Sequence, residues 1–447
     1  MNDLRGNPIS TRSGAAAEAT ERALWRMMSF YGTPLDDLDA AAQADPRWPL
    51  PPLMKAGFPL SLTEPSLVKD AIASLDQAEA LLAHAHDSDN ERERHHLHAL
   101  RLLSCGDWHG ARHAWEALLL RHPRDASALQ WAHLFDFYQG DANNLRQRVA
   151  RVLPEWDSAD PLYPYTLGML AFGLEESNLY AQAEATGRRA LSGSAKVPWA
   201  IHAVAHVMEM QGRHQEGLAW MVKWRPDWTQ GNGFSGHLGW HQALFALESL
   251  DHAAALQLFD EHLLPGPAQI TLQRLDGAAL LWRLHLLGAD VGPRWHALAA
   301  GRDVSERHAG HSAFNDLHAL LAMIGAQDLG RAAAWVHSVA ARAASSSGAN
   351  QDLSRTIGLP LMHGMQAFAE GRFDAALATL YPVRAQAQRF GGSHAQRDLI
   401  DQTLLAAGCG AQSRAIGRAL LNERRFCKAQ TPLTRYWEQR LGRPGAG

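Results

Sequence analysis

Two stretches of the sequence place histidines one helical turn apart. His202 and His206 are separated by four residues in WAIHAVAHVMEM, with Glu209 three residues further on, and His237 and His241 repeat the four-residue step. On a helix, residues spaced by three or four positions lie on one face. Imidazoles and carboxylates gathered in this way can bind a metal, transfer protons or hold a polar ligand. These five residues are therefore the candidate catalytic residues.

The four histidines named above also form a speculative metal site. Two imidazoles at i, i+4 supply two ligands from one helix, and imidazole suits zinc or iron but not calcium. Ala203 directly follows His202, so the glutamate of the zincin motif HExxH is missing. Without a metal, the same residues could perform acid–base catalysis, with Glu209 fixing the tautomer of a neighbouring histidine. A third interpretation is packing alone, because a histidine at a helix interface often donates to a backbone carbonyl.

Further polar residues are candidates for ligand binding. His311, Asn315 and His318 fall at i, i+4 and i+7 in HSAFNDLHALLAM, and Glu175 and Glu176 lie in AFGLEESN. Each stretch precedes a predicted helix end. If successive helices are neighbours, these polar rows can converge with the first four histidines on one pocket.

The segment FGGSHAQRD combines a glycine turn with a helix start. Ser393 can cap a helix whose first turns contain Gln396, Arg397 and Asp398. One interpretation is capping with an Arg397–Asp398 surface pair. The other is that Arg397 faces the pocket and binds a carboxylate or phosphate of a ligand.

An internal repeat supplies the elements that must position these residues. The segment GDWHGARHAWEALLLRHP resembles the second half of a tetratricopeptide repeat, with Gly106 closing a first helix and Trp108 starting a second. The same frame fits at later positions with strides of 34 or 38 residues, near the tetratricopeptide period of 34. The expected closing residues are Gly106, Gly140, Asn178, Gly212 and Leu250, followed by weaker copies near Gly288, Gln327 and Gly371.

This repeat predicts an all-α fold, a right-handed α-solenoid of tetratricopeptide-like helical hairpins over residues 67–440. Residues 1–66 are expected to form an N-terminal tail and a proline-rich strap, with 1–15 loose and 43–66 extended because of six prolines. Residues 441–447 are expected to be a C-terminal tail. The first helix of each hairpin should line the concave face, which places the histidine rows there.

Composition narrows the classes of partner and compartment. The 447 residues are 46% hydrophobic and 20% charged, with a formal charge of −4, so no net positive field favours nucleic acid. No apolar run reaches the roughly 18 to 20 residues of a bilayer span, and the first 20 residues are polar. Three cysteines form no disulfide framework or CxxC pair. We expect a cytoplasmic protein with neither a nucleic-acid nor a membrane partner.

Five segments of the chain resemble the tetratricopeptide repeat protein 38 family. They are AFGLEESNLYAQAE (171–184), WAIHAVAHVMEMQGR (199–213), WHQALFALE (240–248), FNDLH (314–318) and GGSHAQRD (391–398). The resemblance spans about residues 91–433 and implies a tetratricopeptide-type array, but it supplies no reaction. It marks as recurrent polar positions Glu176, His202, His206, Glu209, His237, His241, Asn315, Asp316, His318, Gln396, Arg397 and Asp398.

The leading functional hypothesis is binding of a small molecule or short peptide in a concave pocket lined by histidine and glutamate. Glu176, Asn315, Asp316, His318, Gln396, Arg397 and Asp398 would then contact the ligand. The first alternative is a metal-dependent or acid–base enzyme that uses the same cluster. The second is a protein-interaction scaffold in which the histidines only pack, so that the partner is another protein.

Overall fold

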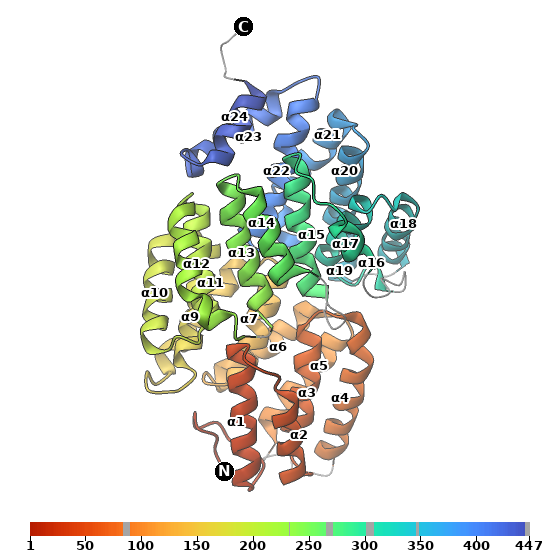
Figure 1. Ribbon diagram of the computed structural model, residues 1–447. Coiled ribbons are helices and arrows are strands. Elements are labelled where there is room, and N and C mark those ends of the chain that lie inside the picture. The colour runs from red at the N-terminus through yellow and green to blue at the C-terminus, as the bar shows by residue number, and fades with distance from the viewer. Residues whose placement is uncertain (84–89, 232, 265–270, 301–307, 346–347, 443–447) are drawn as a thin grey trace. The chain divides into compact units, whose positions relative to one another are not determined.

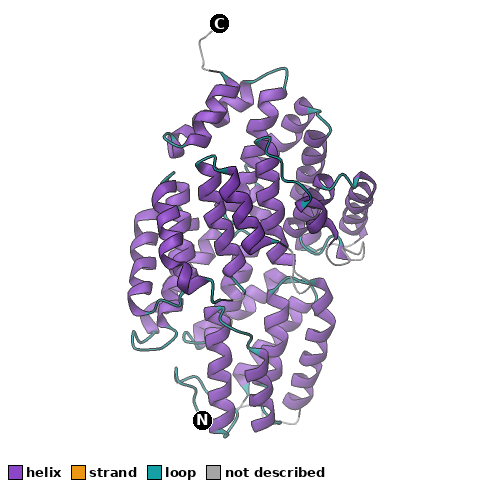
Figure 2. Ribbon diagram, in the orientation of Figure 1, coloured by secondary structure: helices purple, strands orange, loops and turns teal. Residues whose placement is uncertain are grey.

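The computed structural model describes residues 1–447 except for 84–89, 232, 265–270, 301–307, 346–347 and 443–447. The described residues form helices and loops and contain no β-strand, apart from an isolated bridge between Asn2 and Pro8 (Figures 1 and 2). The predicted fold class, an all-α solenoid of helical hairpins, is confirmed. Among the described helices, none is both long and apolar enough to cross a membrane.

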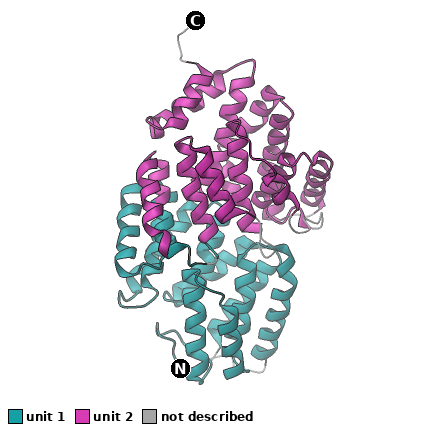
Figure 3. Cartoon of the chain, in the orientation of Figure 1, with its two compact units in different colours: residues 1–204, 227–234 teal, residues 205–226, 235–447 magenta. Residues whose placement is uncertain are grey.

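The chain divides into two compact units (Figure 3). Unit 1 contains Met1–Val204 and Asp227–Phe234, and unit 2 contains Ala205–Pro226 and Ser235–Gly447. The boundaries fall inside α11 (Pro198–Met210) and α12 (His214–Trp228). Each unit has its own buried residues and is described separately below.

Unit 1 is built from antiparallel helices that follow one another along the chain. Its helices are α1 (Gly14–Ser29), α2 (Leu35–Ala44), α3 (Leu50–Ser61), η1 (Pro65–Leu67), α4 (Val68–Ala83), α5 (Glu91–Ser104), α6 (Trp108–Arg121), α7 (Ala126–Tyr138), α8 (Ala142–Val152), η3 (Leu153–Glu155), α9 (Tyr163–Glu176) and α10 (Tyr180–Gly193), with the first part of α11.

Unit 2 continues the hairpins from the second part of α11 and from α12. Its further helices are α13 (Ser235–Glu248), α14 (His252–Leu258), η4 (Phe259–Leu263), α15 (Thr271–Leu286), α16 (Arg294–Ala300), α17 (Ala313–Gly325), α18 (Leu329–Ser345), α19 (Ala349–Leu353), η6 (Ser354–Gly358), α20 (Leu359–Ala369), α21 (Phe373–Arg384), η7 (Ala387–Phe390), α22 (His394–Gly410), α23 (Ala415–Lys428) and α24 (Pro432–Leu441).

Each predicted closing residue adopts the left-handed backbone conformation. The φ angles lie between 59° and 84° at Gly106, Gly140, Asn178, Gly212, Leu250, Gly288, Gln327 and Gly371. At every one of these turns, the N–H of the next residue donates to the carbonyl five residues earlier, as from Asp107 to Leu102 at 2.9 Å. This bond satisfies a carbonyl that the helix end would otherwise leave without a partner. The repeat frame predicted from the sequence is therefore confirmed, turn by turn.

Aspartates start the second helix of several hairpins. The side chains of Asp107, Asp141 and Asp251 each accept a backbone N–H three residues ahead, at 2.8, 3.0 and 3.0 Å. Such N-caps satisfy one free donor of the first turn. Closing turn and cap together fix where one helix ends and the next begins, and so fix which face of each helix is buried.

The last helices of unit 2 pack back onto earlier ones. Helix α22 contacts α15, and α24 contacts α13. The Arg424 side chain on α23 donates to both carboxylate oxygens of Glu248 at the end of α13, at 2.5 and 2.7 Å, and both residues are buried. The indole N–H of Trp282 on α15 donates to Thr403 on α22 at 2.9 Å. The C-terminal helices of unit 2 therefore pack against its earlier helices α13 and α15.

The expectation for the N-terminal part was wrong in two respects. The proline-rich segment 43–66 is not extended throughout, because residues 50–61 form α3. Pro51 and Pro52 occupy its first turn, where the missing N–H has no partner to lose. Residues 1–15 are not loose either: Arg5 and Asn7 are buried, and α1 begins at Gly14. At the other end, α24 runs to Leu441, and residues 443–447 of the expected tail lie outside the described residues.

Helix contacts in unit 2 make a testable prediction about Gly217 on α12. An added Cβ there would lie 2.2 Å from ring atoms of Phe245 on α13. Gly217→Ala should lower the free energy of unfolding by about 1–3 kcal/mol, because the helices must shift to accept the methyl group. The matched control is Gly330→Ala in α18, where an added Cβ meets nothing within 4 Å, and which should be neutral or stabilising by up to about 1 kcal/mol. Urea denaturation of both variants measures the difference, and equal stabilities would contradict the packing.

Candidate functional site

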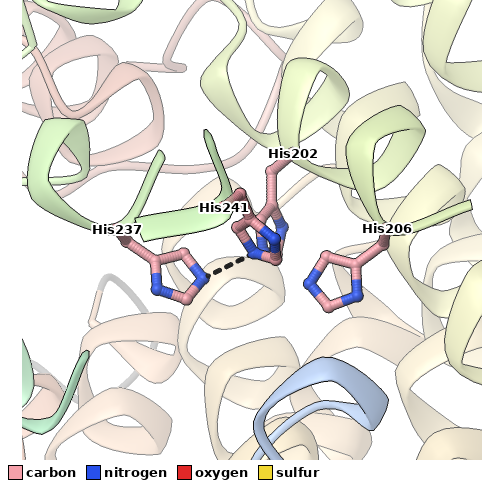
Figure 4. A group of neighbouring side chains, drawn as sticks. All are labelled: His202, His206, His237 and His241. Carbon is pink, nitrogen blue, oxygen red and sulfur yellow. Dashed lines mark hydrogen bonds between the residues drawn. The ribbon is translucent and has the colours of Figure 1, made fainter. Parts of the chain in front are cut away.

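Helices α11 and α13 bring histidines of unit 2 together. His206 and His241 are fully buried, and their ring centroids are 4.5 Å apart. His237, one turn before His241 on α13, has its Nε2 atom 3.3 Å from His241 Nε2 (Figure 4). One ring nitrogen from each of these three residues lies within 4.8 Å of the others.

Two carboxylates bind the outer nitrogens of the α13 histidines. Asp276 Oδ2 on α15 is 2.8 Å from Nδ1 of His237, and Glu209 Oε2 on α11 is 3.4 Å from Nδ1 of His241. An ionised carboxylate only accepts, so each Nδ1 donates its hydrogen. Asp276, His237, His241 and Glu209 thus form one connected polar chain across three helices, a network that can orient the imidazoles for ligand binding or proton transfer.

Burial keeps the central imidazoles neutral. It lowers the pKa of His206 well below its ordinary value, and the nearby His241, His237, His394 and Arg397 lower it further. Burial also lowers the pKa of His241, although the hydrogen bond that its Nδ1 donates to Glu209 raises that pKa. Neutral imidazoles have a lone pair to offer to a metal or to a hydrogen-bond donor.

An aromatic ring and a buried cation support the site. Trp240 stacks on His237 with ring centroids 5.3 Å apart, and the guanidinium of Arg283 lies 5.6 Å from the Trp240 ring. Arg283 donates to the backbone carbonyl of Ala395 at 2.6 Å. Burial lowers its pKa, while the charges of Asp398, Glu209 and Asp276 raise it. Arg283 therefore links the carboxylates of the site to the start of α22.

The predicted residues of α17 are buried but serve local structure. His318 Nδ1 donates to the Phe314 carbonyl at 2.8 Å, and burial lowers its pKa to about 4. Asp316 accepts the N–H of Gly310 at 3.1 and 3.2 Å, and burial raises its pKa to about 8. Asn315 is half-buried. Asp276 and Arg283 also act on the pKa of His318, so His318 lies near the carboxylate side of the site.

The predicted residues of α22 divide between capping and ion pairing. Ser393 and Gln396 form a capping box, so the Gln396 side chain closes the helix end. Arg397 donates to the Gly392 carbonyl of the preceding turn. Asp398 accepts from Gln402 at 3.1 Å and lies 3.6 Å from Arg424. The expected cap is present, and the contacts of Asp398 are with Gln402 and Arg424 rather than with Arg397.

Two predicted residues belong to unit 1. Glu176 is buried at the end of α9. His202 is buried among aromatic rings, with ring centroids 4.9 Å from Phe172 and 5.4 Å from Trp199. The aromatic packing shows that His202 also has a structural role in unit 1.

Sequence reasoning missed Asp276 and Arg283. Both are buried charged residues on α15, the first helix of the next hairpin. A signal was available, because Asp276 lies twelve residues before the closing Gly288 and His237 lies thirteen before Leu250. Near-equal offsets in successive repeats place residues at neighbouring positions on adjacent helices.

Closing turns, strides and antiparallel hairpins define a helical-repeat protein of tetratricopeptide type, with a histidine and carboxylate cluster in its second unit. A search of protein-family models found no match. A tetratricopeptide repeat protein from Parabacteroides merdae, known from its crystal structure, is similar over 70% of this chain and 98% of its own, with 15% identity and a TM-score of 0.32. A likeness at that level says nothing about function, so the class rests on the hairpins and their turns.

The buried His318 makes the stability of the protein depend on pH. Its folded pKa of about 4 lies below the ordinary value of 6.5, so only the unfolded chain binds its proton between these values. Neutral His318 contributes fully to the free energy of unfolding above pH 6.5. This contribution, about 3 kcal/mol in total, is lost as the pH falls toward 4. His318→Asn keeps a donor for the Phe314 carbonyl without titrating and should flatten the stability curve over this range. Denaturation of the wild type and of His318→Asn at pH 7.5 and 4.5 measures this change in the free energy of unfolding. An equal change in both proteins would refute the prediction.

Proposed function

We propose that this chain is a helical-repeat protein that binds a small ligand at the cluster of His206, His237, His241 and Glu209. The observation that supports the proposal is the Asp276–His237–His241–Glu209 chain of contacts. Four ionisable side chains from three helices meet there, inside an apolar array. Burying ionisable groups costs free energy, and apolar side chains at the same positions would pack without that cost. Packing alone therefore does not explain why polar side chains gather here.

Burial limits the size of the ligand. His206 and His241 have no exposed surface, and Glu209 is 7% exposed. His237 is the more open member, with 16% of its side chain exposed. A ligand would therefore reach the cluster on the side of His237, and it would have to be small. This favours a small molecule or an ion over a short peptide.

An acid–base enzyme is the second candidate. Asp276 orients His237 through a short hydrogen bond of 2.8 Å, and carboxylate–imidazole pairs of this kind set the tautomer of a general base. His237 is also the imidazole with solvent access, as a proton-transfer group requires. A protein-interaction role of the remaining helical surface is compatible with both candidates, because helical arrays commonly use extended surfaces to bind partners.

The proposal predicts that a ligand is released from the native protein but not from a cluster variant. The untagged chain is purified, denatured and analysed by mass spectrometry for small molecules and by elemental analysis for ions. We expect a stoichiometric ligand from the wild type and none from the double variant His206→Leu/His241→Leu. In this variant Glu209 loses the donor Nδ1 of His241, so the free energy of unfolding should fall by about 1–3 kcal/mol.

His133→Leu provides the matched control. His133 is a buried histidine of unit 1 whose Nε2 lies 3.1 Å from the Met169 carbonyl. Its replacement should leave ligand content unchanged and cost about 1–3 kcal/mol, because the carbonyl loses its donor. If the wild type releases no ligand, the proposal fails and the cluster histidines are packing residues.

A further inference from the structure

The two imidazoles of α13 face each other through nitrogens that carry lone pairs. Because Asp276 and Glu209 accept from the Nδ1 atoms of His237 and His241, each hydrogen lies on Nδ1. The two Nε2 atoms are then both acceptors, and they are 3.3 Å apart. Two acceptors at this distance repel each other unless a positive species lies between them.

The distance itself is that of two ligands on one metal ion. In a tetrahedral site with metal–nitrogen bonds of about 2.0–2.1 Å, two ligand nitrogens are about 3.3–3.4 Å apart. The alternative is a proton shared by the two rings. A proton would join only two nitrogens, whereas the site gathers more than two.

A third imidazole extends the coordination sphere. His206 has a ring nitrogen within 4.8 Å of those of His237 and His241, and its ring is adjacent to that of His241. Three imidazoles with one water are a ligand set that zinc accepts.

Charge balance allows a bound cation. Asp276 and Glu209 are buried carboxylates that contact the two imidazoles of α13. Arg283 supplies one positive charge near both carboxylates, and a bound cation would supply the remaining compensation that buried charge requires. Moreover, a carboxylate on the outer nitrogen of a ligating histidine is the usual support around a bound metal.

We propose that His206, His237 and His241 bind one divalent transition-metal ion, and that Asp276 and Glu209 orient the ligands of α13. Zinc is the best match because imidazole nitrogen and tetrahedral spacing suit it. The inference rests on the proposed function, since it names the ligand class of the same cluster.

A surface pair of histidines provides an internal comparison. His109 and His113 on α6 also stand at i, i+4, with Nε2 atoms 3.0 Å apart, but both are exposed. Among the residues that the structure describes, they belong to no group of three or more metal-binding side chains. Such an exposed pair should bind zinc only weakly. Comparing it with the cluster shows whether tight binding requires the buried cluster or only two histidines at i, i+4.

Titration of the full-length, untagged chain with Zn²⁺ after chelator treatment tests the proposal. We expect one tight site per chain, with a dissociation constant below about 1 μM, and tetrahedral visible absorption bands when Co²⁺ replaces zinc. His237→Ala and His241→Ala should each weaken binding at least 100-fold. Asp276→Asn removes only the orienting charge and should weaken binding by about 10- to 100-fold. It keeps the size of the side chain, so it stays informative if an alanine variant fails to fold.

The double variant His109→Ala/His113→Ala is the matched control and should keep the tight site. The proposal is overturned if the wild type binds Zn²⁺ no more tightly than His241→Ala and Asp276→Asn, or if the tight site disappears with the surface pair. Failure of this inference is distinct from failure of the proposed function. An organic ligand released by the wild type and not by His206→Leu/His241→Leu would uphold the proposed function while excluding a metal.

Discussion

One hydrogen bond, repeated at eight turns, determines how the helices of this protein meet. At each closing residue a left-handed backbone conformation lets the next N–H reach the carbonyl five residues earlier. Glycine adopts this conformation without strain, whereas Asn178, Leu250 and Gln327 adopt it at a cost of roughly 1 kcal/mol or more each. Tertiary packing must offset that cost. Because the turn sets the end of each first helix, it also sets which residues of that helix face the next one.

The chemistry of the candidate site follows from this register. His206, His241 and Asp276 come from three successive first helices and lie six, nine and twelve residues before their closing turns. The contacts from His237 to Asp276 and from His241 to Glu209 join residues 39 and 32 positions apart, so the fold brings these partners together. The carboxylates then decide the tautomers of the imidazoles, and the tautomers decide which nitrogens remain available. The helix register thus determines the tautomers of His237 and His241, because it places Asp276 and Glu209 next to their Nδ1 atoms.

Features of the fold that recur at regular intervals could be predicted from the sequence. The closing residues and the grouping of His206, His237 and His241 could be predicted from spacing. The helix α3 could not, because the number of prolines obscured that Pro51 and Pro52 stand at tolerated first-turn positions. Asp276 was overlooked although its offset from the closing residue is close to that of His237, because its importance arises from a hydrogen bond to His237 on another helix. Gln396, a candidate ligand contact, forms a capping box with Ser393.

The buried pair of Glu248 and Arg424 joins residues that are 176 positions apart in the chain. Trp282 and Thr403, which are 121 positions apart, form a second such link in the same unit. In an open helical array each repeat touches only its neighbours, so the ends can fray and melting can proceed repeat by repeat. Here the C-terminal helices of unit 2 complete their packing on α13 and α15. Unit 2 should consequently unfold as a single cooperative body and fold more slowly than an open array of similar length, since distant segments must find each other first.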